Sequence, residues 1–582
     1  MLNEYVKAIE ARLNEDQKDM LKSIYEPTVV CVPLCDACYS TCVLPDGEIR
    51  TYGYMDGTYN GDYCGKKFGY LSSVDGGVSW TRHYSKGKID SCAYIYEKGL
   101  YIRCKTIYSG EGEGMYIYRS TVGPEDPNPQ IVKLSDCPYH SIFLPQKSEY
   151  TDRIWFTSQR LAEDCVMVAY MYSDDFGETW TIKEFEVPRT YVRTYPDKGD
   201  RWHVFHGVEP YAVELSEGKM MMLIRSYTDN FQQCFSYDGG ETWTVPEKSV
   251  FHGTNTTPFF LKMSDGKVIS FWNNTQPMPE MRQDKMTPPW DTKGEWEDVF
   301  TNRDVCHVAI SDDCGESWVG FRELYRNSIR NNSDYRRYSD TPVQSDKSVH
   351  QFQAFELPFG KVLVHLGQNS AARRMVIFDR EWLYENSSKE DFSLGLGNVS
   401  THVYLKSISG CKPGINGHCC WNRTNGAVMM PDPDGGFEEF LLISKHHDDR
   451  LLSDVQGVVW NFPTSKTGTV MAELRLVEKR IRISLTDRWF NPCDEYCGEL
   501  AQASFEIDTN DVEPDVFTKV YISYDTEKRF VQVRDDERVY FNVKMKDEAP
   551  VGFSYIIIQC ATDGESKGAY LKKLEKINEL KE

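Results

Sequence analysis

Four copies of one short motif organise this chain. Each copy reads S-x-D-x-G-x-(S/T)-W, in which the Asp side chain can bond nearby backbone amides, the Gly allows a positive φ, and the Trp can pack the turn back onto its sheet. The copies run from Ser73 to Trp80, Ser173 to Trp180, Ser236 to Trp243 and Ser311 to Trp318. Four matches of this length predict a repeated β-hairpin unit.

The motif resembles the Asp-box, or BNR, repeat of the sialidase superfamily, and the resemblance covers residues 25–390. It implies an all-β fold built as a six-bladed β-propeller, and an activity on glycans. The wide gap between Trp80 and Trp180 leaves room for a blade whose motif is lost.

A second periodic feature supports the count of six. Five stretches read as a strand, a polar turn with Gly and a second strand, and a less regular hairpin is expected between Ser141 and Ser158. The five turn glycines are Gly47, Gly99, Gly218, Gly266 and Gly360. Six units are enough to close a propeller, with seven as the alternative.

Composition limits the partners. The chain of 582 residues has a net charge of −22, so no nucleic acid or anionic membrane is expected to bind a basic surface. No apolar run is long enough to span a bilayer. The first residues are charged throughout and predict a helical segment over 1–24, with Asn14 as a cap. Eighteen cysteines without an export signal indicate reduced thiols and a cytoplasmic protein.

Strand patterns continue after residue 390 without the motif, which predicts a separate β-sandwich over 391–582. Its last part resembles the concanavalin-like jelly roll often attached to glycosidases. We interpret it as a structural cap on the propeller rather than as a carbohydrate-binding module, since fold does not fix function. The oligomeric state stays open.

Cys31, Cys35 and Cys38 have the spacing of an iron–sulfur motif, but they lie in a segment that reads as a strand entering a hairpin. We interpret them as packing residues, and we expect neither a metal nor a cofactor.

In a propeller, chemistry belongs at the mouth of the central channel, near the starts of the innermost strands. Polar residues stand near each predicted start: Asp36, Asp90, His140, His206 with Glu209, Asn255, and His350 with Gln351. Together they describe a polar pocket suited to acid/base chemistry.

The fourth unit carries the most specific match. Glu209 precedes its first strand and Arg225 follows its second, as a Glu and an Arg do in sialidases. By this resemblance Glu209 is a general base or charge-stabilising carboxylate, and Arg225 binds an anion or hydroxyl group. Arg303, with His307 beside it, matches a further sialidase arginine. Arg373 and Arg374 follow the second strand of the sixth unit, and one of them is expected to face the channel and the other the solvent.

Two departures separate the chain from a simple sialidase. The family has an Arg near the start of its first inner strand, where this chain has Cys35 and Asp36. The family's Tyr nucleophile is absent from the sixth unit, which reads Ser348-Val349-His350-Gln351. Histidine cannot form the stable aryl glycoside that Tyr forms, and it is better suited to transfer protons. The substrate or the mechanism has therefore changed.

The leading hypothesis is an exo-acting, metal-independent glycoside hydrolase that acts on a small, anionic oligosaccharide or glycoside. The candidate acid/base carboxylates are Glu209, Asp36 and Asp90, and the candidate proton shuttles are His206, His307 and His350. The candidate substrate-binding residues are Arg225, Arg303, Arg373 and Gln351. The alternatives are a β-eliminating lyase on a uronate glycan and a non-catalytic glycan-binding propeller.

Overall fold

The computed structural model describes most of the chain. The described residues are 2–33, 40–54, 68–87, 89, 91–140, 144–162, 165–188, 209–225, 230–253, 256–276, 305–326, 349–367, 373–401, 404–406, 420–422, 426–447 and 454–578. Within these ranges no helix has the length and apolar character required to cross a membrane.

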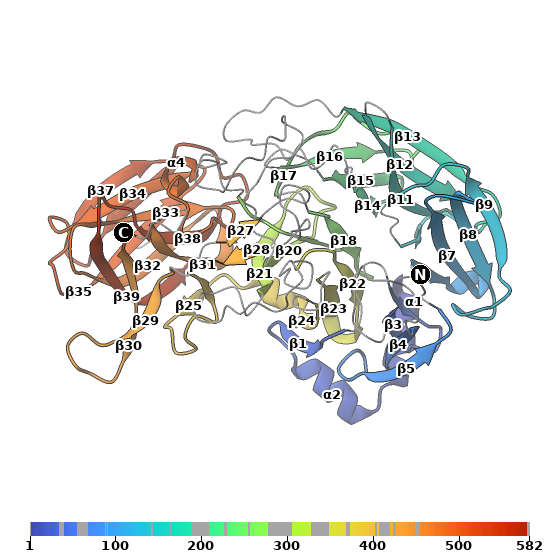
Figure 1. The fold of residues 1–582 in the computed structure, drawn as a ribbon, viewed down its shortest axis with the longest axis horizontal. Helices are drawn as coiled ribbons and strands as arrows, with labels where there is room; N and C mark the ends of the chain where they lie inside the picture. The colour runs from blue at the N-terminus through green and yellow to red at the C-terminus, as the bar shows by residue number, and fades with distance from the viewer. Residues whose placement is uncertain are drawn as a thin grey trace.

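Six four-stranded antiparallel sheets surround one central axis (Figure 1). The predicted six-bladed β-propeller is therefore confirmed, and the six predicted hairpins are the innermost two strands of the six blades. From the axis outward, the first three blades consist of β2 (Thr41–Val43), β3 (Ile49–Tyr54), β4 (Phe68–Ser73) and β5 (Thr81–Ser85); β6 (Cys92–Ile95), β7 (Leu100–Ile107), β8 (Gly114–Ser120) and β9 (Gln130–Ser135); and β10 (Gln146–Lys147), β11 (Ile154–Leu161), β12 (Cys165–Ser173) and β13 (Thr181–Pro188).

The other three blades follow the same plan. They consist of β14 (Tyr211–Ser216), β15 (Lys219–Ile224), β16 (Asn230–Ser236) and β17 (Glu247–His252); β18 (Phe259–Lys262), β19 (Val268–Trp272), β20 (Val305–Ser311) and β21 (Val319–Arg326); and β22 (Gln353–Glu356), β23 (Lys361–Leu366), β24 (Arg374–Asp379) and β1 (Thr28–Cys31). Strands such as β18 and β19 are buried along their whole length, because each blade packs against a neighbour on both faces.

The ring is closed by the N-terminal strand. β1 pairs with β24 in antiparallel register, with Thr28 opposite Ile377, and so supplies the outermost strand of the sixth blade. A second closure lies at the axis, where Gln353 donates to the backbone oxygen of Thr41 at 2.7 Å and accepts from its N–H at 3.1 Å. The first and last blades are thus joined at both their outer and inner edges.

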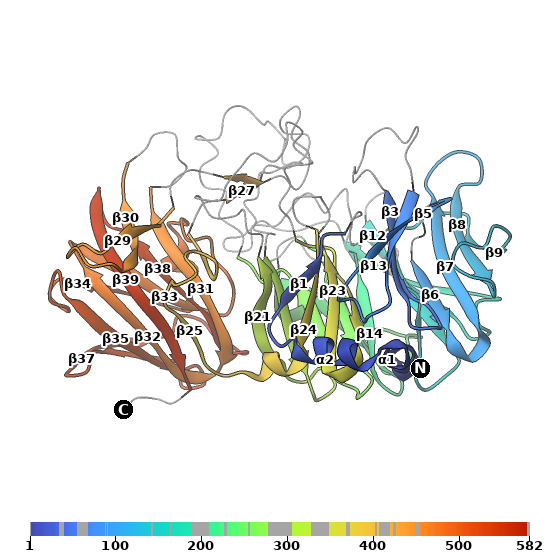
Figure 2. The same ribbon diagram turned by 90° about the horizontal axis from the view of Figure 1, so that it is seen from below.

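The helical segment predicted at the N-terminus is formed by α1 (Leu2–Arg12) and α2 (Glu15–Ser23). Asn14 caps α2 as predicted: its side chain accepts from the N–H of Gln17 at 2.9 Å, and the Gln17 side chain accepts from the N–H of Asn14 at 3.0 Å. Apolar residues of both helices pack against the first and sixth blades, over the turn at Gly47. In Figure 2 the helices lie along the lower edge of the propeller.

Each blade therefore has two ends. We call the end at which the first strand starts the mouth, and the opposite end, where the first strand turns into the second, the far face. The four sequence motifs connect the third and fourth strands, so they lie at the far face, together with α1 and α2.

The four motifs share one hydrogen-bond pattern, illustrated by the copy at 173–180. Ser173 donates to Asp175 at 2.7 Å and accepts from the N–H of Gly177 at 2.7 Å, while Asp175 accepts from the N–H of Thr179 at 2.8 Å. The Trp180 ring N–H donates to the Gly177 carbonyl at 3.1 Å. The second blade lacks the motif but keeps part of the arrangement, since Ser120 donates to Asp126 at 2.5 Å.

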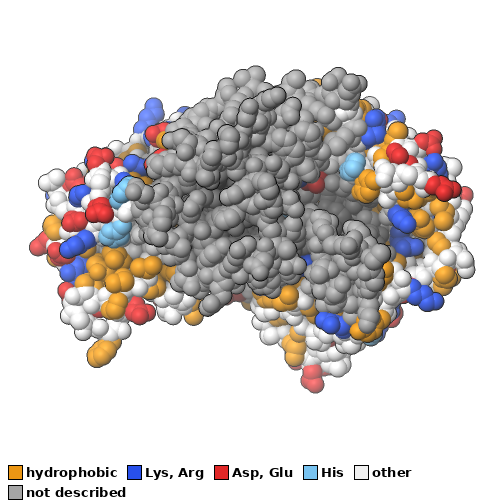
Figure 3. All heavy atoms as spheres, in the orientation of Figure 1, with side chains coloured by type: hydrophobic (Ala, Val, Ile, Leu, Met, Phe, Trp, Pro, Cys, Tyr) orange, Lys and Arg blue, Asp and Glu red, His pale blue; other side chains and the backbone are white. Residues whose placement is uncertain are grey.

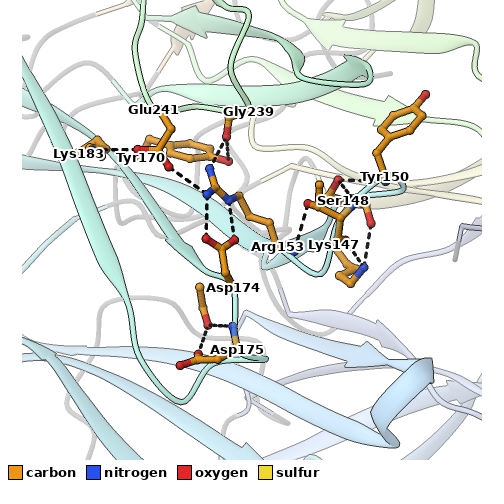
Figure 4. Close-up of polar contacts among 12 residues, drawn as sticks. Lys147, Ser148, Tyr150, Arg153, Tyr170, Asp174, Asp175, Lys183, Gly239 and Glu241 are labelled. Carbon is orange, nitrogen blue, oxygen red and sulfur yellow. Dashed lines mark hydrogen bonds and ion pairs between the residues drawn. The ribbon is translucent and has the colours of Figure 1, made fainter.

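Arg153 links the motifs of the third and fourth blades (Figure 4). Its guanidinium donates to both carboxylate oxygens of Asp174, at 2.7 and 2.8 Å. It also reaches across to the fourth blade, where it donates to the Gly239 carbonyl at 2.8 Å and to Glu241 at 2.9 Å. The group lies 3.7 Å from the ring centre of Tyr172. One side chain thus ties two neighbouring motifs together.

Replacing Arg153 with methionine should lower the free energy of unfolding by about 2 kcal/mol, because charge-assisted hydrogen bonds to two blades are lost. Urea denaturation followed by circular dichroism measures the change. Arg82→Met, at an exposed position of β5, is the matched control and should change stability by less than about 0.5 kcal/mol. Equal effects at the two positions would contradict the proposed link.

Residues after β24 build a second domain of two packed sheets, the predicted β-sandwich (Figure 1). One sheet has the order β29-β30-β39-β32-β35-β36-β37, with β25 (Ser388–Glu390) beside β39, and the other has the order β26-β31-β38-β33-β34. The strands of the first are β29 (Val428–Pro431), β30 (Glu439–Lys445), β39 (Ser566–Ile577), β32 (Thr467–Leu476), β35 (Phe517–Asp525), β36 (Phe530–Arg534) and β37 (Val539–Lys544), and those of the second are β26 (Val399–Ser400), β31 (Gln456–Ser465), β38 (Phe553–Cys560), β33 (Arg480–Thr486) and β34 (Ala503–Asp508).

A short ribbon of β27 (Tyr404–Lys406) and β28 (Cys420–Asn422) and the single-turn helix α4 (Cys497–Leu500) complete the described elements of this domain. Its core is formed by apolar residues of both sheets, such as Val470 and Leu474 from one and Ile483 and Ile556 from the other. The concanavalin-like character of the sandwich stays a prediction.

Candidate active site at the mouth

The mouth brings together the pair that carried the most specific sequence match. Glu209 precedes β14 and Arg225 follows β15; because these strands are antiparallel, both residues lie at the same end of the fourth blade. Arg225 donates from Nη1 to Glu209 Oε2 in a close ion pair. The two side chains are only 4% and 16% exposed, so this pair is shielded from solvent.

Two neighbouring blades hold Glu209 in place. Thr257, just before β18 of the fifth blade, donates its hydroxyl to Glu209 Oε2 at 2.8 Å. Gln159, near the end of β11 in the third blade, accepts from the Glu209 N–H at 2.8 Å. Contacts from the fourth and fifth blades therefore position the Glu209 carboxylate, and a contact from the third blade holds its backbone, which is typical of a preorganised site.

Two of the predicted residues have a positive φ, a backbone conformation that residues other than glycine rarely adopt. Glu209 has φ of 35° and Gln351 has φ of 65°. Positive φ in residues other than glycine costs free energy and is concentrated at functional sites. Each of them stands two residues before the first strand of a blade, so the strain at these residues lies at the mouth.

The sixth blade contributes buried polar groups at the same end. His350 precedes β22 and is 2% exposed, and its carbonyl accepts from the N–H of Gly367, just after β23, at 3.1 Å. Arg373, just before β24, is also 2% exposed. Arg374 donates to the Arg373 carbonyl at 2.6 Å and lies against Tyr325. Of the two neighbouring arginines, Arg373 is thus the buried one.

His307 occupies a different position. It lies near the start of β20, the third strand of the fifth blade, and is fully buried. Its Nδ1 accepts from the N–H of Asn274 at 2.9 Å, so the proton is on Nε2, which lies 2.5 Å from the Tyr555 hydroxyl. Tyr555 in turn donates to Glu323 at 2.9 Å. This geometry favours a structural role at the contact between the domains over the proton-shuttle role predicted for His307.

Further polar contacts join the propeller and the sandwich near His307 and Tyr555. The backbones of Asn274 and Gln276 bond to Trp489 at 2.9 and 2.8 Å. His252 lies 3.2 Å from Asp487, which also pairs with Arg488 at 2.7 Å. Burial lowers the pKa of His252. Burial opposes ionisation of Asp487, but His252 and Arg488 outweigh it and hold its pKa well below the usual range.

Tyr555→Phe should lower the free energy of unfolding by about 1–2 kcal/mol, because the buried His307 N–H and Glu323 lose a shared partner. Chemical denaturation checks this value. Tyr524→Phe is the control: Tyr524 is equally buried, but its hydroxyl meets only Ser465 among the contacts described, at 2.7 Å, and both groups lie within the sandwich. A smaller loss is expected there, and the reverse order would contradict the bridging role.

Several predicted residues cannot be placed. Asp36, Asp90, His206 and Arg303 lie outside the described residues, as does Asn255. His140 is described: its backbone pairs with Gln159, its ring stacks on Tyr108 at 4.7 Å, and burial lowers its pKa.

Sequence reasoning missed Thr257 and Gln159. Neither residue is titratable, so a search for acid/base groups passes over them. A signal for Thr257 was present in the chain, since it stands two residues before β18 just as Glu209 stands two residues before β14.

Surface charge is mixed on the described parts of one face of the molecule. On the face drawn in Figure 3, acidic and basic side chains are interspersed over the described parts of both domains. This face shows no broad basic area among the described residues, which agrees with the net charge of −22.

Comparison with protein families assigns the repeated unit. Residues 136–351 match the family model of a BNR repeat-like domain. The resemblance to the BNR repeat is thereby confirmed over a range that includes three of the four motifs and Glu209, Arg225 and His350. No curated protein matches the chain.

Solved structures similar to the chain include sialidases. Trypanosoma rangeli sialidase in complex with the inhibitor DANA is 12% identical, with 96% of this chain and 92% of that chain covered and a TM-score of 0.35. The NanB sialidase from Streptococcus pneumoniae is 11% identical, with 64% and 73% covered and a TM-score of 0.34. A Dyadobacter fermentans protein of unknown function is 14% identical, with 61% and 99% covered and a TM-score of 0.36. At such identities and scores these likenesses say nothing about the reaction.

Proposed function

We propose that this chain is an exo-acting glycoside hydrolase of the sialidase superfamily that acts on a small, anionic oligosaccharide or glycoside. The observation that carries the proposal is the Glu209–Arg225 pair, shielded at the mouth and fixed by Thr257 and Gln159. The BNR repeat-like match over 136–351 supports the same superfamily.

In this proposal Glu209 acts as a charge-stabilising carboxylate or general base. Its Oε2 already accepts from Arg225 and Thr257, an arrangement that suits a carboxylate that keeps its negative charge while positive charge develops on the sugar. His350 is the candidate proton shuttle, and Gln351 beside it is a candidate for hydroxyl binding.

The ion pair also changes the role proposed for Arg225. Its charge is balanced by Glu209, so its contribution to holding an anionic sugar is reduced, although a guanidinium has five donors and the others can still reach a hydroxyl. Arg373 is then the better candidate among the described residues for binding the anionic group. The candidates Asp36, Asp90, His206 and Arg303 keep the roles predicted from the sequence.

A substrate screen tests the proposal. Purified protein is incubated with a panel of aryl glycosides, including an aryl sialoside, and with uronate oligosaccharides, and Glu209→Gln and His350→Ala are run beside it. Release of the aryl group from at least one glycoside, lost in Glu209→Gln, is expected. Unsaturated products that absorb in the ultraviolet would indicate the lyase alternative instead. Binding without turnover across the panel would overturn the hydrolase in favour of a glycan-binding propeller.

A further inference from the structure

A cavity of about 180 Å³ lies on the axis of the propeller. The first strand of every blade contributes to its wall, from Cys42 of β2 to Ala354 of β22, so the cavity is the central channel itself. At the far face Tyr5 of α1 also lines it, and the Tyr5 hydroxyl accepts from the N–H of Glu356 at 3.0 Å. The N-terminal helix thus lies across the end of the channel that is opposite to the mouth.

The wall of this channel is rich in aromatic residues. Besides Tyr5 of α1, they come from five blades and are Tyr94, Tyr96, Trp155, Tyr211, Phe259, Phe260 and Phe355. The Tyr211 and Phe259 rings lie 4.6 Å apart between centres. Charged groups are confined to the far end, where Lys262 pairs with Glu149 at 2.6 Å. The remaining surface favours a ligand that offers a flat apolar ring.

One edge of each innermost strand borders the channel. The backbone N–H and C=O groups at that edge require hydrogen-bond partners. Side chains meet this need at several points. Gln146 donates to the carbonyl of Ala212 in β14 at 3.2 Å, and Tyr5 meets the N–H of Glu356. A ligand in the channel is therefore expected to carry one polar group that can serve such an edge.

Size limits the ligand further. A cavity of about 150 Å³ lined by apolar side chains holds one benzene ring in another protein. The present cavity is slightly larger. Ala93 and Tyr94, which line it from the innermost strand β6, are only partly buried. One or two fused rings match this space, whereas a sugar of many hydroxyl groups does not match the aromatic wall.

We propose that the central channel of the propeller binds a small aromatic molecule with a single hydroxyl or ring N–H group. This site extends along the channel from the mouth to the far face, and its occupancy does not depend on the proposed hydrolase activity. The site is also linked to the mouth along the chain. Tyr211 and Phe259 line the channel, and they lie two residues after Glu209 and Thr257, which are hydrogen-bonded to each other at the mouth. A bound ring would contact the strands that position Glu209.

Isothermal titration calorimetry with indole, and separately with phenol, tests the proposal on the full chain. Saturable binding of one molecule per chain is expected. Ala93→Phe fills the channel from β6 and should weaken binding at least tenfold. Ala561→Phe makes the same change at a half-buried position of the sandwich and should leave it unchanged. Absence of saturable binding by the unmodified protein, or equal affinity in Ala93→Phe, would overturn the channel site.

Two further measurements keep the test decisive if Ala93→Phe fails to fold. Ala354→Phe fills the channel from the sixth blade and should weaken indole binding to a similar extent. Hydrogen exchange of the unmodified protein should slow in β6, β14 and β18 when indole is added. Protection confined to the sandwich or to the outer strands would place the ligand elsewhere and refute the proposal.

Discussion

Replacing Glu209 with glutamine is expected to lower kcat/KM on the aryl glycoside found by the screen by about 10³-fold, because a neutral amide cannot stabilise positive charge at the sugar or accept a proton. The same change removes the partner of a buried arginine, so the free energy of unfolding should fall by about 3 kcal/mol. Initial rates and urea denaturation measure the two quantities.

Loss of stability alone could lower the rate, so a second variant separates the two effects. In Glu209→Gln/Arg225→Met the unpaired charge is gone, and the stability should return toward that of the native chain. Activity should stay as low as in the single variant. If the double variant regained activity, Glu209 would be a structural partner of Arg225 rather than a catalytic group.

The chain offers a matched control for this experiment. Glu385 forms a similar pair with Arg322 at 2.6 Å, at the far face rather than at the mouth. Glu385→Gln should affect stability but leave kcat/KM within about twofold of the native value. A loss of activity equal to that of Glu209→Gln would contradict the assignment of the mouth as the active site.

Replacing Gly240 with alanine is expected to lower the free energy of unfolding by about 3 kcal/mol. Gly240 closes the motif of the fourth blade with φ of 95°, a conformation that costs an L-residue about 1 kcal/mol. An added Cβ would also lie 2.3 Å from the Tyr170 ring, which is buried between the third and fourth blades. The ring must move, and overpacking of this kind costs about 1–3 kcal/mol more.

The equivalent glycine of the fifth blade separates strain from overpacking. Gly315 has φ of 81°, but its added Cβ would meet its first neighbour, Leu215, at 3.5 Å, an ordinary contact. Gly315→Ala should therefore show only the backbone cost, about 1 kcal/mol. Denaturation of both variants in parallel measures the difference. Equal losses would show that the Tyr170 contact does not matter and would contradict the packing argument.

The fold could be predicted largely because its signals are local. Each S-x-D-x-G-x-(S/T)-W turn satisfies its own hydrogen bonds within eight residues, and each inner hairpin has its own turn glycine, so both survive without knowledge of distant partners. The pairing of β1 that closes the ring was not predicted. Its partner β24 lies at the other end of the propeller, and a strand's sequence does not state which edge it will join.

The site was harder to predict for the same physical reason. Glu209 and Arg225 belong to one hairpin, so their contact follows from its register. Thr257 and Gln159 reach Glu209 from neighbouring blades, and His307 meets Tyr555 of the other domain, so these contacts depend on how separate units pack. A polar residue near a strand start indicates the mouth but does not show which neighbour it will face.

The closure by β1 has a consequence for how the chain reaches its native state. β1 is synthesised before any of the blades, whereas its partner β24 is made only after five blades are complete. Such a non-local pairing slows folding, and until it forms, the outer edge of β24 can pair with a foreign strand. A chain that lacks β1 should therefore form blades yet associate with other copies through that open edge. The propeller is closed within one chain only when β1 pairs with β24.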